Sequence, residues 1–389
     1  MRVLYLNPFS QEVSGPDESL RTLLGVLIPR GVEPHVVLPA PGPQVPRYEA
    51  LGARVHIAPL APLRRELSLN AALYPARLAR GAAAVTNLAH RIKADLIHTN
   101  MEVLLEGALA ASALHLPHVL HYRGNTLDRP KLVFDALVGI WTRCADLVYC
   151  VSGATATLFR QRGHRDDKVE VLYNPVNLSA FDAAPASPEV RATLGAQPGQ
   201  PLIGIVGRIN RRKDLETFVG AAAIVAARSP MARFVVVGAE ESAVESSYRE
   251  QVGHLVEELG LTERLTFAGA RRDIASVMRA LDVFVLTSRH EGFGRVVAEA
   301  MAVARPVVVT NEGALPELVG GGTDGLLAPP GDAAGFARQI LRLLRDRELS
   351  ARLGARAAVA ARQFNVEVIG ERVWTRYRTL VGGRRDAAR

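Results

Sequence analysis

Two acidic residues eight positions apart, Glu291 and Glu299, lie in the otherwise small and apolar stretch "EGFGRVVAEAMAVARPVVVT". The first follows a strand-like run, and the second lies within an apolar helical pattern. A carboxylate accepts several hydrogen bonds, so two of them at one site are suited to the hydroxyl pairs of a ribose or a hexose. In the structural alternative, Glu291 is only a helix N-terminal acid and Glu299 an exposed helix residue.

Two glycines, Gly292 and Gly294, follow the first acid. Because they lack a Cβ, they leave main-chain N–H groups uncovered where the helix begins. A helix N-terminus attracts anions, so this turn is suited to a phosphate or to sugar hydroxyls.

A pair of cations follows an earlier strand-like run, in "GIVGRINRRKDLETFV". Gly207 and Arg208 end that run, and Lys213 comes five residues after Arg208, at the predicted start of a helix. Two cations beside a helix N-terminus can hold a diphosphate from two sides. We therefore predict that Arg208 and Lys213 form an anion clamp, whereas Arg211 and Arg212 are interpreted as solvated loop charges.

The loop after the first strand, "NPFSQEVSGPDESL", places Gly15 just before a proline at the predicted first helical position. Glycine there lets the backbone come close to a ligand. The loop lacks the G-x-G-x-x-G fingerprint, so an ordinary strand-to-helix turn is an equal alternative. No G-x-x-x-x-G-K-[ST] pattern occurs in the chain, which argues against a Walker-type nucleoside triphosphatase.

Short β-rich runs alternate with longer helical patterns along the chain, and these elements must position the loops. Connections long enough for crossover helices imply parallel sheets covered on both faces. The predicted fold class is α/β, with two facing Rossmann-like doubly wound domains and an interdomain cleft. Ligands of such sheets bind beyond the carboxyl ends of the strands, so we expect the site in the loops that follow them.

The chain is predicted to divide into residues 1–175 and 201–365, because 389 residues exceed one ordinary core. Residues 176–200 collect prolines, alanines and polar residues without a strand period, which is typical of a linker. Residues 366–389 carry apolar residues near helical spacing and predict a terminal helix. Whether that helix crosses back to the first domain is left open.

Composition narrows the class of protein. With 48% hydrophobic and 22% charged residues, the chain is typical of a packed protein and not of a disordered one. Its two cysteines form no C-x-x-C pair, which argues against a disulfide framework or structural zinc and favours the cytoplasm. We find no secretory signal and no apolar run of about 18 residues that would span a membrane.

The net charge of +8 favours anionic partners, although solvated arginines explain it equally well. Dispersed arginines, scarce aromatics and the absence of a known motif argue against nucleic acid. Residues 62–93 mix apolar side chains with five arginines, which leads to the hypothesis of peripheral contact with an anionic membrane at its inner face. A solvated helix pair is the alternative.

Taken together, these motifs resemble the retaining glycosyltransferases of family 4. Glu291 through Glu299 match the family's E-x7-E motif, Arg208 and Lys213 its G-R-x-x-x-x-K element, and "AMAVARPVVVTNEGALPELV" and "DGLLAPPGD" its next blocks. The four blocks occur in the family's order. The resemblance continues more weakly through the Gly15 loop, "DLIHTN", "HVLHYRG", "ADLVYCVS" and "VEVLYNPV".

The resemblance implies the GT-B fold, with an acceptor-binding first domain and a second domain that holds the nucleotide-sugar. It also implies a role for each matched position. Glu291 should contact hydroxyls of the donor sugar, Glu299 the ribose diol, and Arg208 and Lys213 the leaving diphosphate. His121 should lie near the reacting sugar, whereas His98 and His118 are interpreted as core residues. The donor-binding set is completed by Gly15, Gly207, Gly292, Phe293, Gly294, Arg295 and Val296, with backbone N–H groups of the last four meeting the sugar or distal phosphate.

Three positions depart from the family pattern. Ala304 stands where a glycine is common, and Pro175 and Asn177 replace the usual glycine and aspartate of the hinge motif. All three lie outside the clamp, so they cast little doubt on catalysis.

The expected reaction transfers a sugar from a nucleotide-sugar, with UDP preferred by family frequency and GDP and ADP open. We expect retention of configuration and neither a metal nor another cofactor, since fixed cations and N–H dipoles can stabilise the leaving diphosphate. The acceptor, whether lipid-linked, a glycan or a small molecule, is not encoded in a recognisable motif. A nucleotide-sugar epimerase or a phosphorylase on the same fold is the nearest alternative, and a dinucleotide-dependent dehydrogenase is weakened by the missing fingerprint.

Overall fold

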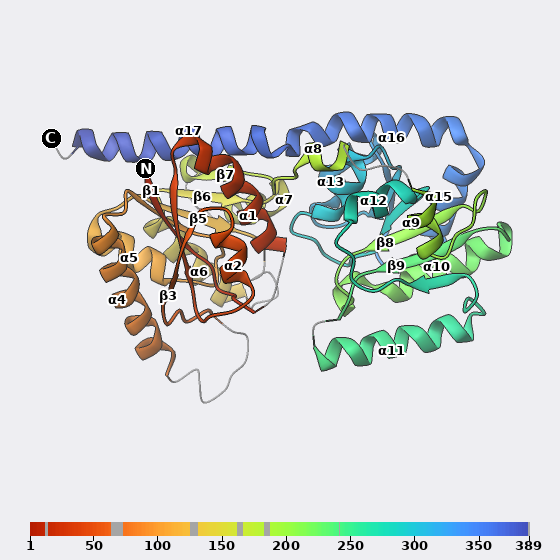
Figure 1. The fold of residues 1–389 in the computed structure, drawn as a ribbon, viewed down its shortest axis with the longest axis horizontal. Coiled ribbons are helices and arrows are strands. Elements are labelled where there is room, and N and C mark those ends of the chain that lie inside the picture. The colour runs from red at the N-terminus through yellow and green to blue at the C-terminus, as the bar shows by residue number, and fades with distance from the viewer. Residues whose placement is uncertain are drawn as a thin grey trace. The chain divides into compact units, whose positions relative to one another are not determined.

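The computed structural model describes residues 1–11, 15–63, 73–124, 131–161, 166–182, 187–240 and 242–387. The chain divides into two compact units. The first unit comprises Met1–Pro175 and Val366–Arg389, and the second comprises Val176–Asn365. Each unit is built on its own parallel sheet (Figure 1).

The described part of the first unit contains a seven-stranded sheet in the order β3-β2-β1-β4-β5-β6-β7, with every neighbouring pair parallel. The reversal of strand order at β1 and β4 is the mark of a doubly wound sheet. Its strands are β1 (Arg2–Leu6), β2 (Glu33–Leu38), β3 (Arg54–Ile57), β4 (Leu96–Thr99), β5 (His118–Tyr122), β6 (Leu147–Cys150) and β7 (Val169–Val171).

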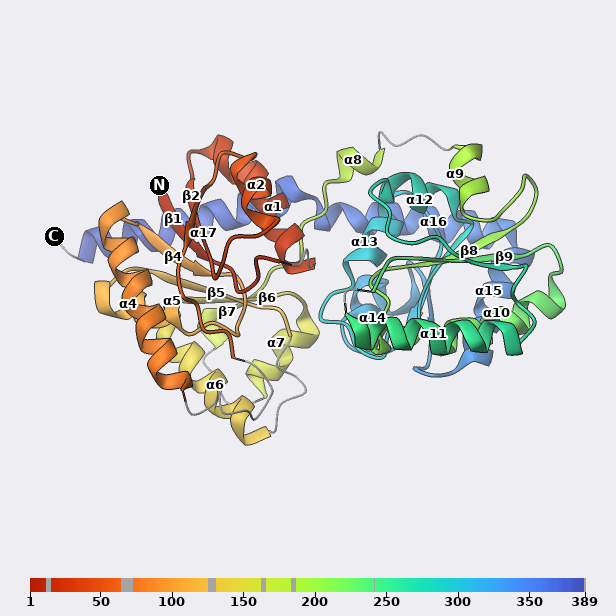
Figure 2. The same ribbon diagram turned by 60° about the horizontal axis from the view of Figure 1, so that its bottom comes forward.

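Helices cover both faces of this sheet (Figure 2). One face packs against α1 and α17, and the other packs against α4, α5, α6 and α7. The alternation follows from the strand period, since neighbouring residues such as Val3 and Leu4 belong to the cores of opposite faces. The helices are α1 (Gly15–Leu27), α2 (Gln44–Glu49), α4 (Tyr74–Ile92), α5 (Glu106–Leu114), α6 (Lys131–Cys144), α7 (Gly153–Arg160) and α17 (Val366–Ala387), with 3-10 turns at Ile28–Arg30 and Asp166–Lys168.

The second unit contains, in its described part, a six-stranded parallel sheet in the order β10-β9-β8-β11-β12-β13. Its strands are β8 (Leu202–Val206), β9 (Arg233–Val237), β10 (Leu265–Phe267), β11 (Val283–Leu286), β12 (Val307–Thr310) and β13 (Leu326–Ala328). Its helices are α8 (Leu178–Asp182), α9 (Pro188–Thr193), α10 (Leu215–Arg228), α11 (Ala243–Glu258), α12 (Ile274–Ala280), α13 (Arg295–Ala302), α14 (Leu315–Leu318), α15 (Ala333–Arg345) and α16 (Arg347–Ala361), with 3-10 turns at Arg211–Lys213, Gly320–Gly322 and Arg362–Phe364.

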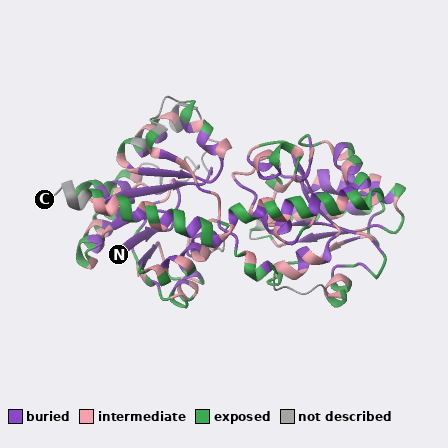
Figure 3. Cartoon of the chain, turned by 90° about the horizontal axis from the view of Figure 1, so that it is seen from above, coloured by how far each residue is buried: buried purple, intermediate pink, exposed green. Residues whose placement is uncertain are grey.

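The central strands of both units are buried, whereas the edge strand β3 is not, and the helices show alternating buried and exposed faces (Figure 3). Strands buried on both sides read as nearly continuous apolar runs, as in "LIGIV" of β8 and "VVVT" of β12. The prediction of two doubly wound α/β domains is therefore confirmed.

The predicted linker and terminal helix can be placed within the units. Residues 176–200 belong to the second unit and include the short helices α8 and α9. Helix α17 belongs to the first unit, where Ile369, Val373 and Tyr377 are fully buried in the same core as β1 and α1. Their spacing of about one helical turn explains why a single face of α17 packs there.

The basic stretch 62–93 lies partly outside the described residues, which omit 64–72. Its described helix, α4, buries Gly81, Val85, Leu88 and Ala89 against the first unit. Over the ranges that the structure describes, no helix combines the length and the apolar character needed to cross a bilayer.

Ala304, one of the departures from the family pattern, occupies the left-handed region with φ of 57°. An L-residue there is strained by about 1–2 kcal/mol, and glycine relieves that strain. Glycine also lowers the stability by about 0.4–1 kcal/mol, because it increases the conformational freedom of the unfolded chain. We expect Ala304→Gly to stabilise the second unit by up to about 1 kcal/mol, measured as a higher urea midpoint.

The matched control for this prediction is Ala355→Gly, the same substitution at an exposed position inside α16. Glycine within a helix should instead lower stability by about 0.5–1 kcal/mol. Equal effects of the two substitutions would show that Ala304 carries no backbone strain.

Candidate functional site

An ion pair joins the two motifs that the sequence singled out in the second half. Lys213 Nζ lies 2.6 Å from Glu291 Oε1, and the two side chains are only 16% and 17% exposed. Lys213 lies beyond the carboxyl end of β8 and Glu291 beyond that of β11, and these two strands are neighbours in the sheet. Lys213 and Glu291 are 78 positions apart in the sequence, and they meet because the strands that precede them are neighbours in the sheet.

Two glycines make room for the lysine. Gly207 has φ of 146°, and a Cβ added to it would come within 3.2 Å of Lys213 Cε. Gly238, at the end of β9, has φ of 152°, and its Cβ would lie 1.9 Å from the Gly207 carbonyl oxygen. A side chain at Gly207 would press on the Lys213 side chain, and one at Gly238 would displace the backbone at Gly207.

Thr287 holds the loop that carries Lys213 in place through hydrogen bonds. The Thr287 hydroxyl donates to the carbonyl oxygens of Lys213 and Asp214 at 2.8 and 3.0 Å. Asp214 adopts φ of 49° and begins α10. Lys213 therefore lies in a 3-10 turn (Arg211–Lys213), one residue before the α10 N-cap, and not within the helix start that the sequence predicted.

Burial and charge act in opposite directions on Glu291. Burial raises the pKa of its carboxyl group, but the charge and hydrogen bond of Lys213 outweigh that effect and hold the pKa below its usual value of 4.5. Glu291 is thus ionised at neutral pH.

The Glu291 pair predicts a pH dependence of stability. Because the folded-state pKa is lowered, the ionised carboxylate stabilises the protein above the unfolded value of 4.5, and this contribution disappears as the pH falls through the folded pKa. We expect Glu291→Gln to be less stable than the wild-type protein at pH 7 and the difference to shrink below pH 4.5. Urea unfolding at both ends of this range measures it. A difference that stays constant down to pH 3 would contradict the role of the charge.

Helix α13 begins without a side-chain cap. Gly294 is its N-cap, with φ of 89°, and its Cβ would lie 2.6 Å from a Leu315 methyl group. The first N–H groups of an α-helix have no partner within the helix, so those of Arg295 and Val296 can serve a ligand. Phe293, just before this turn, is 3% exposed and packs edge-on against Phe364.

Glu299 is buried, which contradicts its interpretation as an exposed helix residue. It is 7% exposed, and Arg295 Nε donates to its Oε1 at 2.8 Å across one helical turn. A carboxylate is costly to bury without such a partner, so the helix supplies its own. Both acids of the E-x7-E motif are thus held by a cation of the second unit.

The remaining cations of this loop differ in their surroundings. Arg208 follows Gly207 directly and is half-buried. Arg211 and Arg212 are exposed, and Arg211 donates to Gln251 at 2.7 Å and lies over the Tyr248 ring. Gly292 is half-buried between Glu291 and Phe293. Over the described ranges, no group of three or more His, Cys, Asp or Glu side chains could hold a metal ion.

His121 of the first unit is enclosed in an aromatic cluster on β5. It is 1% exposed, and its ring lies 5.7 Å from that of His98 and 5.9 Å from that of Tyr149. Burial, followed by the charge of Arg123, lowers its pKa well below the ordinary value. The ring is therefore neutral at physiological pH, and in this conformation it is covered by its own unit.

The other two histidines are core residues, as the sequence suggested. His98 Nδ1 is hydrogen-bonded to the Tyr377 hydroxyl of α17. His118 bonds the Thr99 hydroxyl at 2.9 Å and the Cys144 carbonyl at 3.1 Å. Their hydrogen bonds tie neighbouring elements of the first unit together.

Sequence reasoning missed a buried polar network at the carboxyl edge of the first sheet. Asn7 Nδ2 donates to Asp17 at 2.6 Å, and Asn100 Nδ2 donates to Asn7 Oδ1 at 3.2 Å. Arg123 donates to Asn100 Oδ1 at 2.7 Å and to Asn174 Oδ1 at 2.6 Å. The available signal was position, since Asn7, Asn100 and Arg123 each follow directly, or almost directly, the end of a strand. Gly15 begins α1 beside this network and is exposed.

Comparison with known proteins decides the family. A 2-deoxystreptamine N-acetyl-D-glucosaminyltransferase from Streptomyces fradiae is 31% identical over 98% of this chain and 97% of its own length. The family described as "Glycosyl transferases group 1" matches residues 186–359, and "Glycosyltransferase Family 4" matches residues 13–180. The chain belongs to these glycosyltransferases.

Other relatives of this glycosyltransferase agree. A 2-deoxystreptamine glucosyltransferase from Streptomyces kanamyceticus is 32% identical over 78% of this chain and 83% of its own length. Among solved structures, HepE from Anabaena in complex with UDP superimposes with a TM-score of 0.82 at 28% identity, covering 96% of this chain and 98% of HepE. The expected enzyme class and the GT-B fold are confirmed, and an epimerase or a phosphorylase is not favoured.

Proposed function

We propose that this glycosyltransferase moves a sugar from a UDP-sugar to a hydroxyl group of a polyhydroxylated ring, with retention of configuration and without a metal. The observation that carries the proposal is the Lys213–Glu291 pair beyond β8 and β11, in the same unit as the uncapped start of α13. It supplies a cation for a leaving diphosphate and an acid for sugar hydroxyls.

The donor nucleotide is proposed from both chemistry and relatives. HepE, at 27–28% identity, has been solved with UDP and with UDP-glucose. In our chain, Glu299 would accept hydrogen bonds from the ribose diol, because an ionised carboxylate offers two acceptor oxygens. Gly207 would let the nucleotide approach the end of β8 closely.

Charge stabilisation supports turnover without a metal. Cleavage of the bond between the anomeric carbon and the diphosphate places negative charge on the departing oxygen. Arg208, Lys213 and the N–H groups of Phe293, Gly294, Arg295 and Val296 would receive that charge. These fixed protein groups would take the role that a divalent cation has in other enzymes.

Retention follows if the acceptor enters on the face that the diphosphate leaves. The acceptor oxygen forms the new bond to the anomeric carbon, and its proton passes to the departing diphosphate oxygen. Glu291, paired with Lys213, then positions the sugar and makes no covalent bond to it. His121 stays a proposed neighbour of the reacting sugar, as a neutral ring without charge to contribute.

The acceptor class is proposed from the relatives. Two of them are named for 2-deoxystreptamine, and three are named D-inositol 3-phosphate glycosyltransferases, with 31–34% identity over about half of this chain. Both names describe cyclohexane rings with several hydroxyl groups. Lipopolysaccharide core transferases of Rhizobium meliloti, at 29% and 33% identity, keep a glycan acceptor as the second candidate.

A donor screen tests the proposal. UDP-, GDP- and ADP-sugars are compared by thermal shift, and the stabilising donor is then incubated with 2-deoxystreptamine or inositol phosphate, with and without EDTA. We expect stabilisation by the UDP-sugar, transfer that survives EDTA and an α-linked product from an α-linked donor. Stabilisation by a GDP- or ADP-sugar alone would overturn the UDP donor. Loss of transfer in EDTA would overturn metal independence, and an inverted linkage would overturn retention of configuration.

A cytoplasmic location with contact to the inner face of the membrane completes the proposal. Its support is the basic helix α4, which contains Arg77, Arg80 and Arg91 and no acidic residue. Co-sedimentation with phosphatidylglycerol vesicles at low salt measures it, and recovery of all protein in the supernatant would remove this part.

A further inference from the structure

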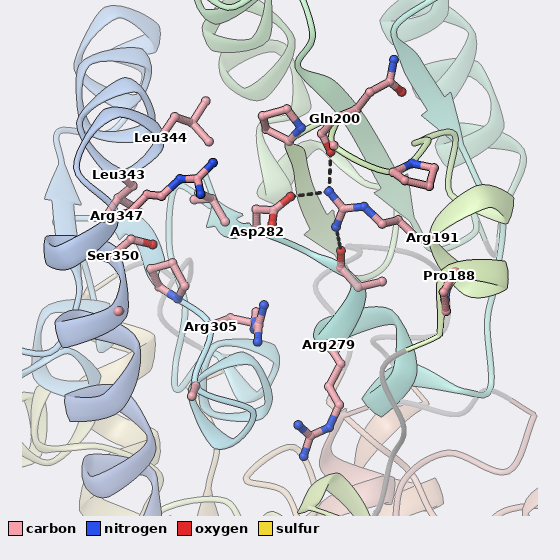
Figure 4. A pocket seen from close by; sticks show the side chains of 18 of the residues that line it. Pro188, Arg191, Gln200, Arg279, Asp282, Arg305, Leu343, Leu344, Arg347 and Ser350 are labelled. Carbon is pink, nitrogen blue, oxygen red and sulfur yellow. Dashed lines mark hydrogen bonds and ion pairs between the residues drawn. The ribbon is translucent and has the colours of Figure 1, made fainter.

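A second pocket opens in the second unit, at the amino-terminal edge of its sheet. It has a volume of about 810 Å³ and is lined by residues just before or at the start of β8, β11 and β12, together with parts of α9, α12, α15 and α16 (Figure 4). Such a volume falls within the range of about 300–1,000 Å³ that is typical of small-molecule sites.

This pocket is separate from the site proposed for the donor. Pro201, Asp282 and Pro306 line it where β8, β11 and β12 begin, whereas Lys213 and Glu291 follow the ends of β8 and β11. In a parallel sheet these are opposite edges, and a strand of five residues spans about 17 Å. The inference therefore does not rest on the proposed donor or acceptor.

The lining of the pocket is cationic. Arg191, Arg279, Arg305 and Arg347 face one acid, Asp282, so the four positive charges exceed the negative one by three. Asp282 is already engaged, because it lies 2.5 Å from Arg191 Nη2 and accepts from the Leu202 N–H at 2.7 Å.

Arg305 and Arg347 are not matched by acids. Within the described ranges, neither forms an ion pair with a carboxylate. Arg305 is half-buried, and its guanidinium donates only to the backbone carbonyls of Val303 and Leu281, at 3.3 and 3.0 Å. Burial lowers its pKa below the ordinary value of 12.5. The charge of Asp282 acts on Arg305 but is shared with Arg191, so the half-buried guanidinium is only partly compensated and an anionic ligand would stabilise it further.

The two cations approach the hollow from different elements. Figure 4 shows Arg347 reaching from the start of α16 toward Asp282, with Arg305 at the near side of the same space. Arg279 donates to the carbonyl oxygens of Phe181 and Asp182 at 2.9 and 3.0 Å, and in Figure 4 its guanidinium points away from Arg305 and Arg347. Arg305 and Arg347 are therefore the groups that a bound anion would contact.

We propose that this pocket binds a phosphorylated small molecule, with its phosphate groups between Arg305 and Arg347. Guanidinium groups bind phosphate through paired, charge-assisted hydrogen bonds. The Ser350 hydroxyl in the first turn of α16 adds a donor, and Leu343 and Leu344 form an apolar wall for the rest of the molecule. A small soluble ligand is favoured over a macromolecule because the arginines line a bounded pocket and not an extended surface stripe.

Binding of inorganic pyrophosphate tests the proposal. The measurement uses isothermal titration calorimetry on the full-length chain carrying Lys213→Ala, which removes one of the two cations of the clamp proposed for the donor. We expect one site, and we expect a further Arg347→Ala substitution to weaken its affinity by about tenfold or more, as for a lost charge-assisted hydrogen bond. Arg347 is exposed and forms no hydrogen bond with the described residues, so this variant should fold.

Two further variants separate a site from general electrostatics. Arg352→Ala removes the same charge from α16 outside the pocket lining and should change the affinity less than about twofold. Ala351→Trp leaves the charge intact but fills the pocket and should abolish binding. No binding in the Lys213→Ala protein, equal weakening by Arg347→Ala and Arg352→Ala, or unchanged binding in Ala351→Trp would each overturn the proposal.

A phosphate group could also be presented by a lipid. Phosphatidylglycerol vesicles are therefore tested by co-sedimentation with the same variants. Arg347-dependent vesicle binding, without pyrophosphate binding in solution, would replace the soluble ligand by a lipid headgroup and overturn the proposal as stated.

Discussion

Replacing Lys213 by alanine is expected to slow sugar transfer by about 10²- to 10³-fold, or about 2.7–4 kcal/mol in activation free energy. The lysine is largely buried, so its charge is weakly screened, and it lies beside the acid proposed to hold the sugar. Its loss removes a donor aimed at the leaving diphosphate and leaves Glu291 buried without its cation. The turnover number at saturating donor, followed through release of UDP, measures the effect.

Arg211→Ala is the matched control for Lys213→Ala. Arg211 lies two residues earlier in the same 3-10 turn, but it is exposed and bonded to Gln251. We expect its removal to change turnover less than about threefold, as for a solvated charge. The double variant Lys213→Ala/Glu291→Gln tells whether the unpaired acid contributes, because it removes the buried charge as well. Near-normal turnover in folded Lys213→Ala protein would remove the clamp from the mechanism.

The parallel sheets could be predicted because their strands are buried on both faces. Runs such as "LIGIV" and "RFVVV" have no polar alternation, and crossover helices separate them. In a doubly wound sheet, strands that are distant in the sequence become neighbours. This topology brings Lys213 to Glu291 across 78 residues. Local pattern and topology were sufficient for that part of the site.

Properties that depend on packing could not be predicted from the pattern. His121 reads as a polar residue near a strand end, but its ring points into an aromatic cluster that includes Tyr149. Glu299 was equally compatible with an exposed helix face until the structure showed it 7% exposed beside Arg295. The pocket of the second unit gathers its four arginines from four sequence regions with no shared spacing, so no motif predicts it.

Replacing Glu299 by alanine is expected to raise the KM for the donor by about 10- to 100-fold while the turnover number changes little, because hydrogen bonds to a charged group contribute about 1.5–3 kcal/mol. The carboxylate is proposed to bind the ribose, which is remote from the bond that breaks. An interaction that is equal in the ground state and the transition state affects KM and not kcat. We therefore expect loss of Lys213 to lower the turnover number and loss of Glu299 to raise the KM for the donor.

Binding of UDP alone provides the decisive measurement for Glu299, since the ribose is common to UDP and the UDP-sugar. Its dissociation constant should rise by the same factor as the donor KM, with Glu299→Gln intermediate because the amide keeps one acceptor oxygen. Glu258→Ala, an exposed acid at the end of α11, serves as the control and should leave both values unchanged. Arg295 loses its charged partner in both Glu299 variants, so a graded response between them reports the number of remaining acceptor oxygens and not the loss of the ion pair. Unchanged UDP affinity in Glu299→Ala, or a fall in kcat equal to that in kcat/KM, would place this carboxylate at the reacting sugar or outside the site.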